Sequence, residues 1–173
     1  MGLKEVLRER LQDAFAKKAL KANEMSEFYL VNLLSDFHFA FEKPLAILMM
    51  DASHRDQQTK IKELKCVGDT ALVIVGFFAE RVQRTIMGLP YYTSMGGLAY
   101  RKLSTLLSSE DDLVEVYLDL SNNFKRYAEA LSIVAPWNIA SSNADLIKIY
   151  ERWLSTRDGH LRKVLEKEGI INK

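Results

Sequence analysis

The sequence predicts an all-α protein, a single-domain helical bundle of about six to eight helices around a buried central helix at about residues 70–87. Three observations support this prediction. Apolar residues recur at helical spacing along most of the chain, and only three prolines and eight glycines interrupt it. Residues 71–79 are apolar at every position. The length of 173 residues can bury a substantial core, so residues 1–173 are predicted to form one domain.

The apolar run at residues 71–79 is predicted to be a buried helix. Its three consecutive β-branched residues favour a strand locally, but Phe78, Val82 and Ile86 continue beyond it at helical spacing. The run is far shorter than the roughly 20 residues that span a bilayer, so no membrane span is predicted. Gly76 costs about 1 kcal/mol relative to alanine inside a helix, which predicts that another helix passes close to it.

Flanking residues predict where the central helix begins and ends. Asp69 is a suitable N-cap, Gly88 a suitable C′ residue, and Pro90 follows where a helix cannot continue. Residues 55–67 are predicted to form a surface helix before it. That helix either continues into the central helix or breaks at Gly68.

The N-terminal part of the chain is predicted to form three helices. The first, over residues 3–22, is amphipathic. The second is predicted to be capped by Ser26, and the third to carry Pro44 in its first turn. His38 lies among aromatic residues of the second helix, where a packed core histidine is the expectation and a ligand-binding histidine the alternative.

Asp51 and His54 lie three residues apart, a spacing that places a carboxylate and an imidazole on one helical face. This is half of a bundle metal site, which also needs matching residues on other helices. The sequence contains no second copy, and turn or capping roles explain Asp51 and Ser53 equally well. No metal site is therefore predicted.

The segment YYTSMGGLAYRKL after Pro90 combines three tyrosines with a pair of glycines. Two adjacent glycines in or just before a helix are costly unless something passes close to the backbone. That neighbour is either another helix, with the tyrosine hydroxyls capping loose ends, or a flat ligand. The candidate ligand-binding residues are Tyr91, Tyr92, Gly96, Gly97, Tyr100 and His38.

A heptad pattern follows, and it predicts one long helix opened by a capping box at Ser109 and Asp112. The apolar seam consists of Leu113, Tyr117, Leu120, Phe124, Tyr127, Leu131 and Val134. In a chain this rich in helices, the seam is expected to pack inside its own bundle, with packing against a second copy as the alternative.

Two further helices are predicted after Pro136, which ends the heptad helix. A capping box at Ser142 and Asp145 precedes the first of them, with Tyr150, Trp153 and Leu154 predicted to face inward. The last helix is predicted over residues 158–168, closed by Gly169.

Composition limits the classes of function. The formal net charge is +1, with both signs interspersed, which argues against a nucleic-acid binder. Cys66 is the single cysteine, so no internal disulfide is possible, and a reducing, cytoplasmic compartment is expected. The N-terminus shows no secretory signal. No catalytic motif is present, and a lone cysteine without an identifiable base is typically inert. No catalytic residue and no cofactor are predicted.

The segments VGDTALVIVGFFAERV, YYTSMGGLAYRKL and IYERWL resemble a family of uncharacterised bacterial all-helical proteins. The resemblance spans most of the chain and implies a bacterial cytoplasmic setting, without an activity to transfer. The expected function is a non-enzymatic interaction or regulatory module that binds a protein partner or itself.

Two other functions remain open. The first is a small-molecule or haem-type cofactor binder in which the YYTSMGGLAY segment forms a wall and His38 serves as axial ligand. That segment is similar to the glycine-bearing distal helix of haem oxygenase-type bundles, by analogy only. The second is a carboxylate and histidine metal enzyme that uses Asp51 and His54.

Overall fold

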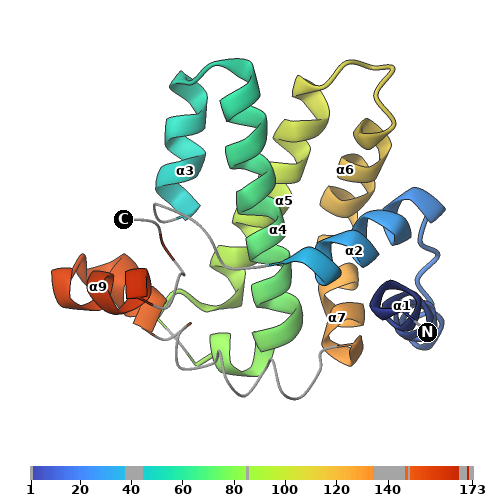
Figure 1. The fold of residues 1–173 in the computed structure, drawn as a ribbon, viewed down its shortest axis with the longest axis horizontal. Coiled ribbons are helices and arrows are strands. Elements are labelled where there is room, and N and C mark those ends of the chain that lie inside the picture. Colours follow the sequence, from blue (N-terminus) through green and yellow to red (C-terminus); the bar gives the residue numbers. More distant parts are fainter. Residues whose placement is uncertain are drawn as a thin grey trace.

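The computed structural model describes residues 2–37, 45–84, 86–134, 147, 149–167 and 171, and these residues form helices and connecting turns without a strand. The all-α prediction is therefore confirmed for the described chain (Figure 1). The elements are α1 (Leu3–Lys17), α2 (Glu24–Asp36), α3 (Leu45–Asp51), the short 3₁₀ helix η1 (Ala52–His54), α4 (Gln57–Val82), α5 (Gly88–Leu106), α6 (Leu113–Asn122), α7 (Phe124–Val134) and α9 (Gly159–Lys167). Helical backbone is also present at residue 147 and over residues 149–156.

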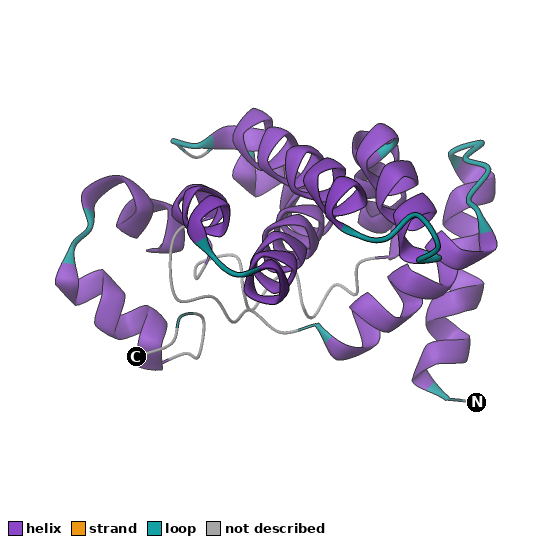
Figure 2. Cartoon of the chain, turned by 90° about the horizontal axis from the view of Figure 1, so that it is seen from above, coloured by secondary structure: helices purple, strands orange, loops and turns teal. Residues whose placement is uncertain are grey.

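The long helix α4 stands in the middle of the molecule and packs against α3, α5 and α7 (Figure 1). Helix α1 packs on α2 and α7, and α6 lies against α5. Helices α1 and α9 lie at opposite ends of the molecule, as the views in Figures 1 and 2 agree. No helix in the described part of the chain is long and apolar enough to cross a membrane.

The central helix differs from the prediction at both ends. Helix α4 begins at Gln57 and passes through Gly68 without a break, so Asp69 lies inside the helix and is not its N-cap. A Cβ atom on Gly68 would lie 2.6 Å from the ring of Tyr100. The glycine therefore makes room for a tyrosine and does not end a helix. At the other end, non-helical torsion angles at Phe78 (φ −125°, ψ 19°) precede the last turn, and the helix ends at Val82.

Gly76 meets a neighbouring helix, as the sequence predicted. A Cβ atom there would lie 2.7 Å from the Cβ atom of Leu131 and 3.3 Å from the backbone oxygen of Ala128, both on α7. The cost of glycine inside a helix is thus offset by the close packing of α4 on α7.

The start of α5 corrects the interpretation of Gly88 and Pro90. Gly88 has a φ of 68°, the left-handed conformation expected for it, but it begins α5 and does not cap α4. Pro90 lies in the first turn of α5, where a helix tolerates a missing N–H donor. Gly96 and Gly97 consequently lie inside a regular helix.

The heptad segment forms two helices where the sequence predicted one. Asn123, with φ −113° and ψ 21°, separates α6 from α7. The seam nevertheless stays inside the chain, because its residues from Tyr117 to Val134 are all buried. The predicted capping box at Ser109 and Asp112 is not formed. Instead, the backbone N–H of Leu113 donates to Asp111 Oδ1 at 2.9 Å.

The first two helices differ from the prediction: α1 ends earlier, and α2 begins earlier. Helix α1 ends at Lys17. Helix α2 begins at Glu24, and the side chain of Asn23 caps it by accepting from the N–H groups of Met25 and Ser26. Ser26 is therefore not the cap; it is buried and donates to a carboxylate on α6.

The C-terminal region agrees with the prediction where it is described. Tyr150, Trp153 and Leu154 are buried, and α9 spans Gly159–Lys167 against the predicted residues 158–168. The predictions for His38, Pro44, Pro136, Ser142, Asp145 and Gly169 lie outside the described residues.

Candidate binding site: a cleft with a buried carboxylate

The predicted tyrosine–glycine segment does not form one site. Gly96 faces a filled interior, since a Cβ atom there would lie 2.4 Å from the ring of Phe124 and 2.9 Å from Ala71. At Gly97 the nearest atom to such a Cβ is 3.9 Å away, the backbone oxygen of Ser121. The close crossing of helices is sufficient to explain Gly96, and neither glycine lines a described cavity.

The three tyrosines of the segment contact different parts of the molecule. The rings of Tyr91 and Tyr92 pack edge to face at 5.0 Å between centroids. Burial, with the Glu151 carboxylate adding to it, raises the pKa of Tyr92. Tyr100 instead reaches α4, where its hydroxyl donates to Asp69 Oδ1 at 2.8 Å. His38 lies outside the described residues.

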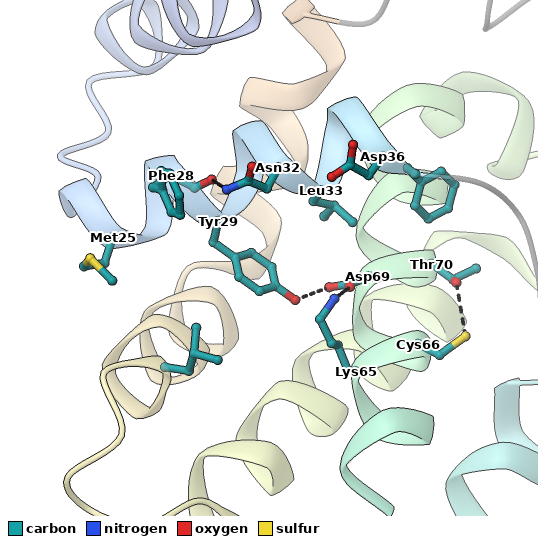
Figure 3. A pocket seen from close by; sticks show the side chains of 12 residues that line it. Met25, Phe28, Tyr29, Asn32, Leu33, Asp36, Lys65, Cys66, Asp69 and Thr70 are labelled. Atoms are coloured by element: carbon teal, nitrogen blue, oxygen red, sulfur yellow. Dashed lines mark hydrogen bonds and ion pairs between the residues drawn. The ribbon is translucent and has the colours of Figure 1, made fainter. Parts of the chain in front are cut away.

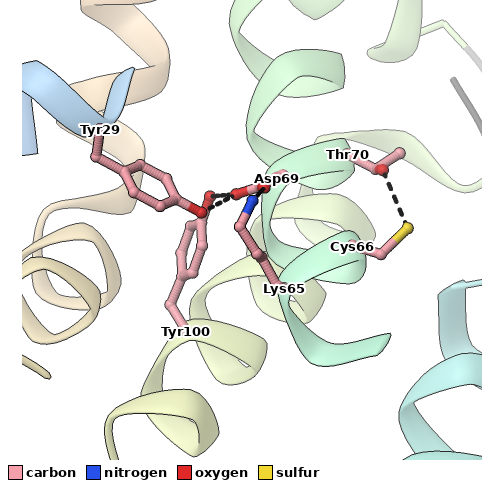
Figure 4. Close-up of polar contacts among 6 residues, drawn as sticks. All are labelled: Tyr29, Lys65, Cys66, Asp69, Thr70 and Tyr100. Atoms are coloured by element: carbon pink, nitrogen blue, oxygen red, sulfur yellow. Dashed lines mark hydrogen bonds and ion pairs between the residues drawn. The ribbon is translucent and has the colours of Figure 1, made fainter. Parts of the chain in front are cut away.

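The contact of Tyr100 belongs to a polar group that we call the Asp69 cluster, formed by Tyr29, Lys65, Asp69 and Tyr100 (Figure 4). The Tyr29 hydroxyl donates to Asp69 Oδ1 at 2.5 Å, alongside Tyr100. The Lys65 ammonium donates to Asp69 Oδ2 at 2.5 Å. One buried carboxylate thus connects α2, α4 and α5, and Asp69 is only 6% exposed.

The electrostatics of the cluster keep both tyrosines protonated. Burial, with negative charge of neighbouring groups including Asp69 adding to it, raises the pKa of Tyr29 and of Tyr100 well above the ordinary value for tyrosine. The two hydroxyls therefore remain hydrogen-bond donors at neutral pH. They hold the Asp69 carboxylate in place, and Oδ1 accepts a hydrogen bond from each of them.

Lys65 is held less firmly than the tyrosines. Its side chain is 46% exposed, and it pairs with Asp69 one helical turn away. The ammonium also lies 5.2 Å from the centroid of the Tyr29 ring. Two exposed partners at this i, i+4 spacing are typically worth about 0.3–0.5 kcal/mol. Because Asp69 is buried, the bond is worth more here, about 1 kcal/mol, and the exposed Lys65 ammonium can return to water when another cation takes its place.

Three members of the Asp69 cluster, Tyr29, Lys65 and Asp69, line a cleft of about 460 Å³ between α2, α4 and the start of α6 (Figure 3). Its walls are mainly apolar. Met25 and Phe28 stand at the rim and are 43% and 53% exposed. The lining residues are Met25, Phe28, Tyr29, Asn32, Leu33, Asp36, Phe37, Lys65, Cys66, Asp69, Thr70 and Leu113.

The cleft contains a protonated thiol. Burial raises the pKa of the Cys66 thiol, and its sulfur lies 3.9 Å from the Thr70 hydroxyl. Cys66 is therefore a thiol at neutral pH, which is a poor nucleophile. Among the described residues, no group of three or more histidine, cysteine, aspartate or glutamate side chains could hold a metal ion. Asp51 ends α3, and His54 is exposed in η1.

A second cavity, of about 610 Å³, lies where the end of α4 meets the start of α5 and the surface of α7. Thr93 contributes to it from the tyrosine–glycine segment, and Pro90 from the residue directly before that segment. Apolar residues such as Val75 and Leu89 share its lining with Lys125 and other polar groups.

Sequence reasoning missed most of the cleft. Of the four residues in the Asp69 cluster, only Tyr100 was among the predicted site residues. The available signal was Asp69 itself, a carboxylate at the edge of a wholly apolar run with a lysine four residues before it. That spacing is typical of a helical ion pair, but the same aspartate also fits an N-cap.

No protein-family model, curated protein or solved structure matches this chain. No family or homologue is therefore identified.

Proposed function

We propose that the protein is a non-enzymatic interaction module, and that a segment of a partner protein places its side chains in the cleft between α2 and α4. The observation that carries this proposal is the exposure of Phe28 and Met25 at the rim of a mainly apolar cleft. Aromatic residues and methionine are enriched at protein interfaces, and methionine adapts to varied apolar partners.

The open rim favours a protein segment over an enclosed small ligand. Small-molecule sites bury about 70–90% of the surface of a drug-sized ligand. This cleft is open at its edge, where the side chain of Phe28 is 53% exposed to solvent. An exposed aromatic ring loses most of its contact with water only when a larger surface covers it. A partner segment that inserts side chains provides such a surface.

In vivo photo-crosslinking tests the proposal. Benzoylphenylalanine replaces Phe28 in one variant and Ile133 in a matched control. Ile133 is 40% exposed on α7 and does not line the cleft. We expect a discrete protein adduct at position 28 and none of the same mass at position 133. Absence of an adduct at position 28, or identical adducts at both positions, would contradict the proposal.

A second candidate function is small-molecule binding in the cavity at Pro90 and Thr93. Its volume of about 610 Å³ is favourable, because ligand pockets typically measure about 300–1,000 Å³. We expect Ser132→Trp, at the edge of this cavity, to abolish the thermal stabilisation that a bound ligand produces. A haem titration without a Soret shift argues against the haem-type version of this function.

The single-domain organisation and the bacterial cytoplasmic setting are part of the same proposal. The resemblance of VGDTALVIVGFFAERV to uncharacterised bacterial proteins supports the setting, and the lone Cys66 is compatible with a reducing compartment. One cooperative unfolding transition by two spectroscopic probes is the expected behaviour of a single domain. Two separate transitions would show that the chain unfolds as more than one unit and would contradict the single-domain organisation.

A further inference from the structure

The partner segment has a chemistry that the cleft itself specifies. We propose that it is an apolar segment bearing a lysine, whose ammonium group displaces that of Lys65 from Asp69 Oδ2. This inference rests on the proposed function, because it names what enters the same cleft. It assigns Asp69 as the recognition residue and Lys65 as an internal occupant that gives way.

Asp69 is prepared to accept a cation from outside. Tyr29 and Tyr100 both donate to Oδ1 and fix the carboxylate in place. The donor to Oδ2 is the side chain of Lys65, which is 46% exposed and belongs to the same helix. Moving Lys65 into solvent requires no change in the helices, and Asp69 keeps both tyrosine bonds meanwhile.

The charge around the cleft favours a cationic partner. Among the described residues that line it, Asp36 and Asp69 are acidic and Lys65 is the single cation. The acidic run Glu110–Asp112 directly precedes Leu113, another lining residue. Asp111 is close enough for its charge to contribute to the raised pKa of Tyr117, whose ring lies 5.6 Å from that of Tyr29. Such a field repels an acidic segment and steers a basic one toward the cleft.

The geometry favours lysine over arginine. A guanidinium binds a carboxylate best as a fork that uses both oxygens. Here Oδ1 already accepts two tyrosine hydroxyls, so a cation has only Oδ2 available and a fork across both oxygens is blocked. An ammonium group is a compact point charge and needs only that one oxygen. The ring of Tyr29, which already lies under the Lys65 ammonium, offers the incoming cation the same face.

Fluorescence anisotropy with labelled leucine-rich peptides tests the proposal. The peptides are identical except at one central position, which carries lysine, arginine, norleucine or glutamate. We expect the lysine peptide to bind the wild-type protein most tightly, with norleucine weaker by about tenfold and glutamate weakest. Lys65→Met, which removes the competing ammonium, should strengthen the lysine peptide. Asp69→Asn preserves the shape of the side chain and should remove the preference for lysine over norleucine.

The outcomes separate this inference from the proposed function. Phe28→Ser damages the rim without touching the Asp69 cluster, and it should weaken every peptide. If lysine and norleucine peptides bind equally and Phe28→Ser weakens both, the partner cleft stands and the lysine assignment is overturned. A glutamate peptide that binds best, or a lysine preference that survives Asp69→Asn, also overturns it. If no peptide binds, the inference and the proposed function fall together. Free butylammonium that binds as tightly as the lysine peptide would overturn the assignment of a protein segment.

Discussion

Two aspartates of this protein are built alike and placed differently. Asp69 on α4 accepts from Tyr29 and Tyr100. Asp119 on α6 accepts from the Tyr127 hydroxyl at 2.5 Å and from the Ser26 hydroxyl at 2.6 Å, both at Oδ2. Each carboxylate joins helices that are distant in sequence. Each is held by hydroxyl donors, which give strong charge-assisted hydrogen bonds.

The difference lies in what completes each carboxylate. The second oxygen of Asp119, Oδ1, accepts from the Asn123 side-chain amide at 2.8 Å, and Asp119 lines none of the described cavities. The second oxygen of Asp69 accepts from a half-exposed lysine at the floor of a cleft. A hydrogen-bonded carboxylate ties helices together in both places, but only at Asp69 does one oxygen accept from a half-exposed side chain that can move into solvent.

The largest expected effect is a loss of stability on removal of Asp69, which is more buried than Asp119. Asp69→Ala removes the acceptor of the Tyr29 and Tyr100 hydroxyls, and Tyr100 is fully buried. Because each stranded buried donor costs about 1–3 kcal/mol, we expect a loss of about 3 kcal/mol in the free energy of unfolding. Ser26 and Tyr127, the hydroxyl donors at Asp119, are also buried. Asp119 itself is more exposed, so water that enters at its position can accept from them, and Asp119→Ala should cost less, about 1–2 kcal/mol. Urea denaturation measures both, and equal losses would contradict the contrast.

Gly68 provides the next test, because it makes room for Tyr100. Gly68→Ala places a methyl group 2.6 Å from the Tyr100 ring and forces that ring to move. Overpacking of this kind typically costs about 1–3 kcal/mol, and the hydrogen bond to Asp69 is strained as well. Gly97→Ala is the matched control, since its nearest neighbour is 3.9 Å away. Relief of glycine flexibility should make it stabilising by about 0.5–1 kcal/mol. Thermal unfolding decides the signs, and stabilisation by Gly68→Ala would contradict the packing.

Alkaline pH should lower the free energy of unfolding through the tyrosines around both aspartates, and more through those around Asp69. Burial raises the pKa of Tyr117 to about 12, and it also raises the pKa of Tyr29, Tyr100 and Tyr127. Unfolded tyrosine titrates near pH 10, so above that pH the folded state holds protons that the unfolded state has lost. Stability is therefore complete below about pH 10 and falls as the pH rises toward the folded pKa, by about 1.4 kcal/mol per pH unit for each such tyrosine.

Denaturation across this alkaline range measures the slope directly. Tyr127→Phe should remove the contribution of one tyrosine to the fall in stability with pH and leave most of that fall unchanged. The double variant Tyr29→Phe and Tyr117→Phe should flatten the slope further. A stability that stays constant or increases above pH 10 would show that the folded tyrosines do not hold their protons.

The smallest expected effect concerns Lys65. Lys65→Met should lower the free energy of unfolding by about 1 kcal/mol, because the lysine is half-exposed but the carboxylate that it leaves is buried and keeps only its two tyrosine donors. Asn123→Ala, which removes the corresponding donor to the second oxygen of Asp119, serves as the comparison. Chemical denaturation of both variants gives the answer. A loss of several kcal/mol for Lys65→Met would mean that the lysine is a fixed part of the fold.

Much of the fold follows from local pattern. Helical spacing of apolar residues and the seam between Tyr117 and Val134 could be predicted because each depends on residues within a few turns of one another. A close neighbour at Gly76 could also be predicted, but not that the neighbour is Leu131 on α7. The break at Asn123 could not, because the seam continues through it without a change of spacing.

The candidate site was harder to predict, because its residues meet only after folding. Asp69 and Ser26 both fit the local pattern of a helix cap, yet both are buried hydrogen-bonding residues in the structure. Tyr29 lies 40 residues from Asp69 in the sequence, and Tyr100 lies 31 residues away. Local propensity contains no information about partners at such separations.

The ligand-induced rise in melting temperature tests the central claim most directly. A ligand that binds only the folded state raises the melting temperature, and the rise grows with the logarithm of the ligand concentration divided by Kd. With the leucine-flanked lysine peptide, we expect the wild-type protein and Asp119→Asn to show the same rise, and Asp69→Asn to lose most of it. A rise that persists in Asp69→Asn, or one that disappears in Asp119→Asn, would contradict the division of roles between the two carboxylates.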